Sequence, residues 1–335
     1  MGEDGGVGAA DERRAVADPA ARPARVLFWG TPEFAVPALR ALAGAGHEVV
    51  GAVTRPDRPA GRGRAVRASA VKVEAAARGI PVLQPERPAG EEFERRLREL
   101  APDVSIVAAY GHILRDEILV LPPFGSLNIH ASLLPKLRGA APVNWAIIRG
   151  CERSGVTVMR MVREMDAGPV LYQIPVPIGP RMTAGELYER TARLGAEAIV
   201  ETLARLREDR LVEREQDHAR ATYAPKLDRP AARVVWGRPA DEVSRWIRGC
   251  DPWPGAWTEL DGLSVQLFSS VPEEGREGGG EPPGQVVKTD SRRGLLVAAG
   301  RGGVWVEEVK PAGRRRMESI AWVRGRGVSV GARFE

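Results

Sequence analysis

The sequence predicts an α/β domain built on a doubly wound, mostly parallel sheet, followed by a small all-β barrel domain. Apolar strand-like runs alternate with helical patterns up to residue 209, and this alternation is typical of a parallel sheet covered on both faces. After residue 230 the pattern changes to short apolar runs separated by glycine-rich turns, which indicates a barrel. With 335 residues the chain is long enough for each domain to bury its own core. We therefore expect a disordered tail at 1–24, the first domain at 25–209, a linker at 210–229 and the barrel domain at 230–335.

The first domain opens with a continuous apolar strand pattern at 24–30 that ends at Gly30. Residues 31–46 then have helical spacing, with Thr31 as a candidate cap and Pro32 in the first turn. Further strands are expected at 47–54, 79–85, 102–111 and 126–130, further helices at 71–78, 91–100 and 183–209, and two strands around a turn at 154–178. In such sheets ligands bind beyond the carboxyl ends of the strands, so Gly30, Tyr110-Gly111 and Asn128 to His130 are expected around one crevice.

The second domain is expected to begin with a short helix within 239–257, followed by Pro-Trp-Pro-Gly-Ala. Its strands are expected at 257–270, 283–290, 294–300 and 303–312. The acidic, glycine-rich segment 272–283 lies between them and is expected to be a mobile loop.

Composition excludes several classes of protein. A hydrophobic content of 43% with 28% charged residues is ordinary for a soluble protein, and no apolar run approaches the ~20 residues of a membrane helix. The 1–24 segment lacks the apolar core of a signal peptide. Cys151 and Cys250 have no metal-ligand spacing, so we expect them to be free thiols in a reducing cytoplasm. The sequence contains neither a GxGxxG nor a GxxxxGK[ST] motif, so nothing supports a nicotinamide or nucleoside-triphosphate role.

Three polar side chains form a candidate catalytic site. Asn128 and His130 lie two apart on an expected strand, so they point to the same face, and Asp166 arrives from a second loop. An amide, an imidazole and a carboxylate suit acyl transfer without a Ser or Cys nucleophile. The alternative is structural, because polar residues at strand ends often satisfy loop backbone and an Asp in a turn often caps its own backbone.

The string NIHASLLPKLRGAAPVNWAI, with MDAGPVL downstream, resembles the signature of the formyltransferases that use 10-formyltetrahydrofolate. GTPEFAVPAL resembles the first strand and helix of the same family. The resemblance implies a Rossmann-like formyltransferase domain, with Asn128, His130 and Asp166 as the catalytic residues and with no metal required. It further implies that the folate site is lined by Ser132, Leu133, Leu134 and Pro135. An amine that attacks a formyl carbonyl creates an oxyanion, which the Asn128 amide and a protonated His130 are suited to stabilise.

The acceptor of the formyl group has to be inferred from other segments. Residues 55–72 are basic and rich in Gly and Pro, and PAGRGR within them resembles the inserted loop that meets the acceptor stem in the tRNA-acting members of the family. Arg62 is the position that the resemblance transfers, and the neighbouring candidates for tRNA contact are Arg58, Arg64 and Arg67. The alternative is a charged loop that contacts only solvent.

RWIRGCDPWPGAWT resembles the entry into the C-terminal domain of the same tRNA-acting members, which implies an OB-like barrel that adds tRNA affinity. Candidate phosphate contacts there are Lys310, Arg314, Arg315, Arg316, Arg324 and Arg326. Candidate stacking residues are Trp246, Trp253, Trp257, Trp305 and Trp322, although core packing is the more frequent use of a barrel tryptophan. The resemblance therefore implies an enzyme of translation initiation that binds methionyl initiator tRNA and formylates its α-amino group. We further expect it to act as a monomer in the cytoplasm.

Two alternatives stay open at this point. One is a folate-dependent formyltransferase that acts on a small-molecule or sugar-nucleotide amine, and the other is an RNA-binding protein without catalytic activity. The chain also departs from the family pattern at His112, at Arg115 and at Gly249-Cys250. His112 lies near the expected crevice, where it could serve as a second acid or base or as an ordinary loop residue.

Overall fold

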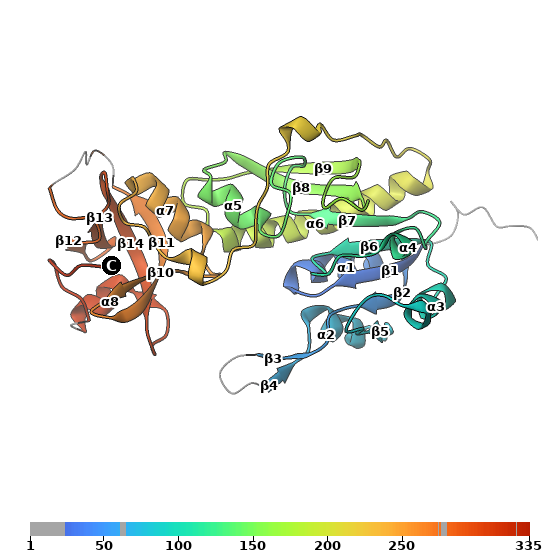
Figure 1. Ribbon diagram of the computed structural model, residues 1–335, viewed down its shortest axis with the longest axis horizontal. Helices are drawn as coiled ribbons and strands as arrows, with labels where there is room; N and C mark the ends of the chain where they lie inside the picture. Colours follow the sequence, from blue (N-terminus) through green and yellow to red (C-terminus); the bar gives the residue numbers. More distant parts are fainter. Residues whose placement is uncertain (1–23, 61–64, 274, 276–279, 326) are drawn as a thin grey trace, which may run out of the picture.

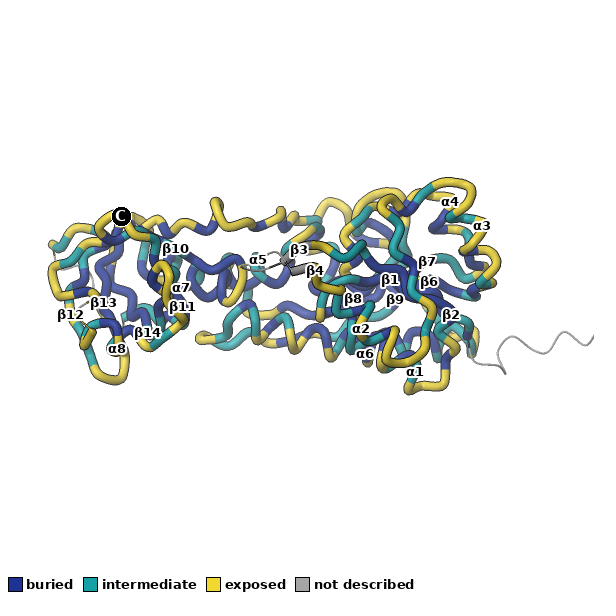
Figure 2. The backbone as a smooth tube through the Cα atoms, turned by 90° about the horizontal axis from the view of Figure 1, so that it is seen from below, coloured by how far each residue is buried: buried dark blue, intermediate teal, exposed yellow. Residues whose placement is uncertain are grey.

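The computed structural model describes residues 24–60, 65–273, 275, 280–325 and 327–335. The tail predicted at 1–24 falls outside these residues except for Ala24, as do Arg62, Arg64 and Arg326. The first domain and the C-terminal sheet domain occupy opposite ends of an elongated molecule (Figure 1). The backbone is buried in the middle of each of the two bodies and exposed at their rims (Figure 2).

A seven-stranded sheet forms the first domain, as the sequence predicted. Its strands, in spatial order, are β5 (Val82–Leu83), β2 (Glu48–Val53), β1 (Arg25–Gly30), β6 (Val104–Ala108), β7 (Ser126–His130), β8 (Arg153–Arg160) and β9 (Val170–Pro177). From β5 to β7 all neighbours are parallel, whereas β7, β8 and β9 are antiparallel. The order changes direction between β1 and β6, which is where open sheets of this type place their ligands.

Alternate residues of the central strands face two separate cores. Val26 and Phe28 pack on the face covered by α1 (Val36–Gly44) and α6 (Ala184–Arg207). Leu27 and Trp29 pack on the other face, which is covered by α3 (Glu91–Glu99) and α4 (Asp116–Leu119). Burial of both sets explains the uninterrupted apolar runs, since each strand is covered on both sides.

Several details differ from the sequence predictions. Thr31 does not cap the first helix, because its hydroxyl donates to the carbonyl of Tyr110 (3.0 Å), and the helix begins as the short 3₁₀ turn η1 (Glu33–Ala35). The strand expected at 79–85 is confined to β5. The basic segment is not an irregular loop, since it contains a hairpin of β3 (Arg58–Ala60) and β4 (Ala65–Arg67) that leads into α2 (Ala70–Ala77).

The C-terminal domain is an antiparallel sheet with the order β10-β11-β14-β13-β12, and β15 pairs with β14. The strands are β10 (Ala256–Leu260), β11 (Leu263–Pro272), β12 (Val286–Asp290), β13 (Gly294–Ala298), β14 (Gly303–Pro311) and β15 (Met317–Glu318). The end of the chain joins the two edges of the sheet, since Glu335 exchanges backbone hydrogen bonds with Glu259 of β10 while Val286 of β12 donates to Ala332. Helix α8 (Ser319–Arg324) and the buried Trp322 and Phe334 complete the core.

Helices α5 (Pro142–Ile148) and α7 (Ala240–Gly249) pack together between the two sheets. Trp145 and Trp246 meet edge to face at 6.3 Å, and a Cβ at Gly249 would lie 2.4 Å from the side chain of Ile148. The close approach therefore explains Gly249, one of the departures from the family pattern. Among the described residues, no helix is both long and apolar enough to cross a membrane. The exact domain and linker limits stay a prediction.

Candidate active site

Strand β7 carries Asn128 and His130 to the carboxyl edge of the sheet, next to the end of β6. The alternate residues Leu127 and Ile129 are buried in the core, which fixes the face that the two polar residues share. His130 is only 6% exposed, and its Nε2 lies 3.0 Å from the carbonyl oxygen of Leu137. Its Nδ1 lies 3.7 Å from the carboxylate of Asp166. One ring nitrogen therefore lies at hydrogen-bond distance from a carbonyl oxygen, and the other faces the carboxylate at ion-pair distance.

Asp166 lies in the loop between β8 and β9, in the left-handed backbone region with φ of 53°. Its carboxylate accepts the backbone N–H of Gly139 at 2.7 Å through the same oxygen that faces His130. A non-glycine residue in this backbone region is strained, and it persists only where its surroundings hold it. The structure thus brings the predicted His130 and Asp166 together and ties both to the loop that follows β7.

That loop contains the four residues predicted to line a folate site. The Leu134-Pro135 peptide bond is cis, and the buried Ser132 donates its hydroxyl to the carbonyl of Lys136 (2.6 Å). Thr157 on β8 donates to the carbonyl of Ser132 (2.6 Å) and accepts the N–H of Leu134 (3.1 Å). Leu134 is buried, whereas Leu133 and Pro135 are partly exposed. A role of the four in folate binding stays a prediction.

A hydrogen-bond network behind Asp166 was not predicted from the sequence. Gln216 donates its amide to the carbonyls of Asp166 (2.9 Å) and Gly168 (2.7 Å), and its amide oxygen accepts from the Arg138 guanidinium (2.7 and 3.2 Å). Gln216 and Arg138 are both buried. The sequence gives no signal for Gln216, because it lies in a polar, turn-rich segment that predicts only a linker.

Tyr110 and His112 lie at the carboxyl end of β6, on the neighbouring side of the crevice. Burial raises the pKa of the Tyr110 phenol to about 12, against the opposing effect of the nearby Arg55. The His112 ring packs against Tyr110 at 5.5 Å, and its buried Nε2 has no hydrogen-bond partner among the described residues. The observed contact of His112 is thus a packing contact. It does not connect His112 to the predicted catalytic trio of Asn128, His130 and Asp166.

The β3–β4 hairpin projects from the first domain along the long axis of the molecule, towards the C-terminal domain (Figure 1). Arg58 and Arg67 are direct cross-strand partners and both are exposed. Like charges opposite each other destabilise a hairpin, and an anion bound between them would relieve this repulsion. At the base of the hairpin, Asp57 pairs with Lys72 at 2.5 Å and accepts a hydrogen bond from Gln84, so Lys72 is already neutralised.

The predicted basic and aromatic residues of the C-terminal domain fall into different environments. Lys310, Arg314, Arg315 and Arg324 are exposed. Arg316 instead pairs with Glu308 and with Asp251, a carboxyl whose burial raises its pKa against the opposing hydrogen bonds from Arg316. Trp305 and Trp322 are buried, and Trp246 and Trp257 are partly buried. Trp253 is 69% exposed and is the member of this set best placed to stack on a base.

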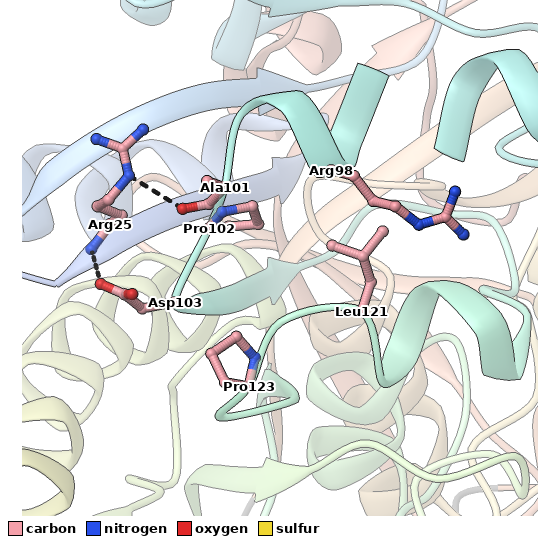
Figure 3. A pocket seen from close by; sticks show the side chains of 7 residues that line it. All are labelled: Arg25, Arg98, Ala101, Pro102, Asp103, Leu121 and Pro123. Carbon is pink, nitrogen blue, oxygen red and sulfur yellow. Dashed lines mark hydrogen bonds between the residues drawn. The ribbon is translucent and has the colours of Figure 1, made fainter. Parts of the chain in front are cut away.

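The opposite edge of the sheet has a hollow of about 590 Å³ at the amino ends of β1 and β6 (Figure 3). The polar groups of Arg25 that line it already bond within the fold, to the carbonyl of Ala101 and to the Asp103 carboxylate. This hollow is remote from the trio, because it lies at the other end of the same strands. Among the described residues, no cluster of His, Cys, Asp and Glu side chains could hold a metal ion.

The two domains match one class of enzyme. Residues 24–203 match the family model described as Formyl transferase, and residues 226–327 match the model described as Formyl transferase, C-terminal domain. The methionyl-tRNA formyltransferase of Symbiobacterium thermophilum is 47% identical over 92% of this chain and 95% of its own length. The methionyl-tRNA formyltransferase of Thermobifida fusca is also 47% identical, over 92% of this chain and 99% of its own. The chain therefore belongs to the methionyl-tRNA formyltransferase family.

Solved structures support the fold over most of the chain. A HypX variant from Aquifex aeolicus superposes with a TM-score of 0.64 and 21% sequence identity. The superposition covers 92% of this chain and 49% of HypX, so this chain corresponds to about half of that larger protein. At this level of identity the likeness concerns the fold alone.

Proposed function

We propose that this chain transfers the formyl group of 10-formyltetrahydrofolate to the α-amino group of methionyl initiator tRNA. The observation that carries the proposal is the pairing of His130 with Asp166 at the carboxyl edge of the sheet. This pair occurs in a chain that aligns over 92% of its length with relatives named methionyl-tRNA formyltransferase. The same alignment extends through the C-terminal domain, which makes a small-molecule amine a less favoured acceptor.

In the proposed reaction the methionine amine attacks the formyl carbon, and the carbonyl oxygen becomes an oxyanion. The Asn128 amide and the protonated His130 stabilise this charge as donors positioned before the reaction begins. His130 exchanges the Leu137 carbonyl for the oxyanion, while Asp166 keeps the imidazole oriented. The intermediate then breaks the bond between the formyl carbon and the folate nitrogen. The amine loses a proton in this sequence and the folate nitrogen gains one, with the trio as the relay.

We assign the donor site to the loop from Ser132 to Pro135 and part of the tRNA site to the β3–β4 hairpin. The exposed Arg58 and Arg67 would contact phosphates near the acceptor end, together with Arg62 and Arg64 of the same segment. The exposed Lys310, Arg314, Arg315 and Arg324 would extend the contact over the C-terminal domain. We also propose that the protein works as a monomer in the cytoplasm, and light scattering of the purified chain tests the first of these points.

A formylation assay tests the proposed function. The purified chain is incubated with 10-formyltetrahydrofolate and either methionyl initiator tRNA, methionyl elongator tRNA or a sugar-nucleotide amine, and the products are separated after base hydrolysis. We expect formylmethionine from the initiator tRNA, much less from the elongator tRNA and no formylated sugar. Formylation of the sugar alone would favour the small-molecule alternative, and no product from any acceptor would leave a non-catalytic RNA-binding role.

A further inference from the structure

The segment between the two domains is bound to both loops of the active site. Residues Arg214 and Val170 exchange two backbone hydrogen bonds next to the loop of Asp166 (2.8 and 2.9 Å). Further along, Thr222 and Ala224 bond to Arg138 in the loop that follows β7 (2.8 and 2.7 Å). A flexible linker would leave these loops free, whereas the observed segment joins them.

Gln216 lies between these two attachment points and is 5% exposed. Its amide nitrogen donates to two carbonyls of one turn, those of Asp166 (2.9 Å) and Gly168 (2.7 Å). The turn needs such support because Asp166 has a φ of 53°, which is unfavourable for a residue with a Cβ. The two bonds hold the backbone from which the Asp166 carboxylate projects towards His130.

Arg138 determines the orientation of the Gln216 amide. A guanidinium has only donors, so the side-chain atom of Gln216 that lies 2.7 Å from it is the amide oxygen. The NH₂ group is therefore directed at the two carbonyls, which accept. Arg138 is 4% exposed, and its Nη2 also lies 3.1 Å from Nδ1 of His218, which accepts for the same reason.

We infer that Gln216 is a positioning residue for the proposed reaction: it holds the Asp166 turn so that the carboxylate faces His130. This inference rests on the proposed function. Among the described residues, Gln216 makes no hydrogen bond to the side chains of Asn128, His130 or Asp166, and it acts through the backbone of Asp166. Because the same segment continues into the C-terminal domain, it also connects the domain proposed to bind tRNA with the catalytic carboxylate.

Two substitutions of Gln216 separate positioning from general stability. Gln216→Met removes the hydrogen bonds at similar length, while Gln216→Glu keeps the shape and the pairing with Arg138 but loses the donation to the two carbonyls. For both variants we expect kcat on methionyl-tRNA to fall by about 10- to 100-fold, the range for a displaced catalytic group. The KM values for tRNA and for the formyl donor should stay within about twofold, because the binding surfaces are unchanged. Glu215→Gln, at the exposed neighbouring position, is the matched control and should keep full activity.

A double-variant comparison tests whether Gln216 acts through Asp166. The variant Asp166→Asn/Gln216→Met should be as slow as Asp166→Asn alone, since a carboxylate that is absent cannot be displaced. Fully additive losses, or an unchanged kcat in the folded Gln216→Glu variant, would overturn the inference. If the unaltered chain does not formylate methionyl-tRNA, the proposed function fails instead, whatever the result at Gln216.

Discussion

The proposed catalytic residues His130 and Asp166 differ from the β3–β4 hairpin in how firmly the fold holds their side chains. His130 is 6% exposed, and Asp166 is fixed through its carboxylate and through its backbone. Arg58 and Arg67 are exposed, and within the described part of the chain neither has an acidic partner. The difference follows from the chemistry. Stabilising a transition state needs donors that are already in position, whereas binding a phosphate backbone needs only accessible charge.

The largest expected effect comes from replacing His130 or Asp166 themselves. Replacing His130 by Ala or Asp166 by Asn should lower kcat by ~10²-fold or more, because a donor or its orienting charge is lost. The KM for methionyl-tRNA should hardly change in steady-state formylation assays. Asp209→Asn is the matched control, since Asp209 also has a left-handed backbone (φ 52°) but is exposed and lies just beyond the end of α6. Nearly full activity of His130→Ala would remove the trio from the mechanism.

A smaller effect is expected where the backbone holds the carboxylate. Gly139 has a φ of 115°, and a Cβ there would lie 2.8 Å from the carbonyl oxygen of Ala224. Gly139→Ala should therefore shift the N–H that binds Asp166, and it should lower the free energy of unfolding by about 1–3 kcal/mol, the usual range for such strain. Thermal unfolding and kcat are both measured, with Gly179→Ala as the control because a Cβ there meets nothing within 4 Å. Wild-type kcat in Gly139→Ala would show that this N–H does not position Asp166.

Substitutions in the β3–β4 hairpin should change tRNA binding and leave the chemical step unchanged. Arg58→Ala and Arg67→Ala should each raise the KM for methionyl-tRNA by several-fold, while kcat at saturating tRNA is kept. Each should also reduce the slope of log KM against log salt concentration by about one unit, the change expected for one lost phosphate contact. Arg95→Ala removes the same charge from the far helix α3, where Arg95 already pairs with Glu92 and Glu99. If Arg95→Ala has the same effect, net charge rather than the hairpin governs binding.

The sequence could predict the features that depend on neighbouring residues, and it could not predict those that depend on residues far apart in the chain. Local patterns located β7 to the residue and placed His130 and Asn128 on one face, because apolar alternation and burial act within a few residues. The positions of β1, β6 and α6 were predicted for the same reason. The support for Asp166 was not predictable, because it joins Gln216 to a turn that lies 50 residues earlier in the chain.

Two other differences have similar causes. Thr31 carries an N-cap sequence signal, but its hydroxyl bonds instead to Tyr110, which lies 79 residues further along the chain. A cap pattern cannot reveal such a competing partner. The β3–β4 hairpin was missed because each of its strands has only three residues, and Val66 is the one β-branched residue in the two strands.

The smallest expected effect concerns the ion pairs of Glu74, which lie away from the proposed active site and from the hairpin. It shows how much such a pair contributes to the free energy of unfolding. Glu74 on α2 binds Arg40 (2.6 Å) and Arg78 (2.7 Å), and these partners lower its pKa from 4.5 to about 2. Because the folded-state pKa is the lower one, the stabilisation is complete above about pH 4.5 and is lost as the pH falls towards 2. Glu74→Gln should therefore reduce the free energy of unfolding at pH 7 by no more than ~1 kcal/mol, with a smaller difference at pH 3. Urea unfolding of both proteins at the two pH values measures this. A difference that grows at pH 3 would contradict the assigned ion pairs, whereas kcat should be the same in both proteins because Glu74 touches neither the trio nor the hairpin.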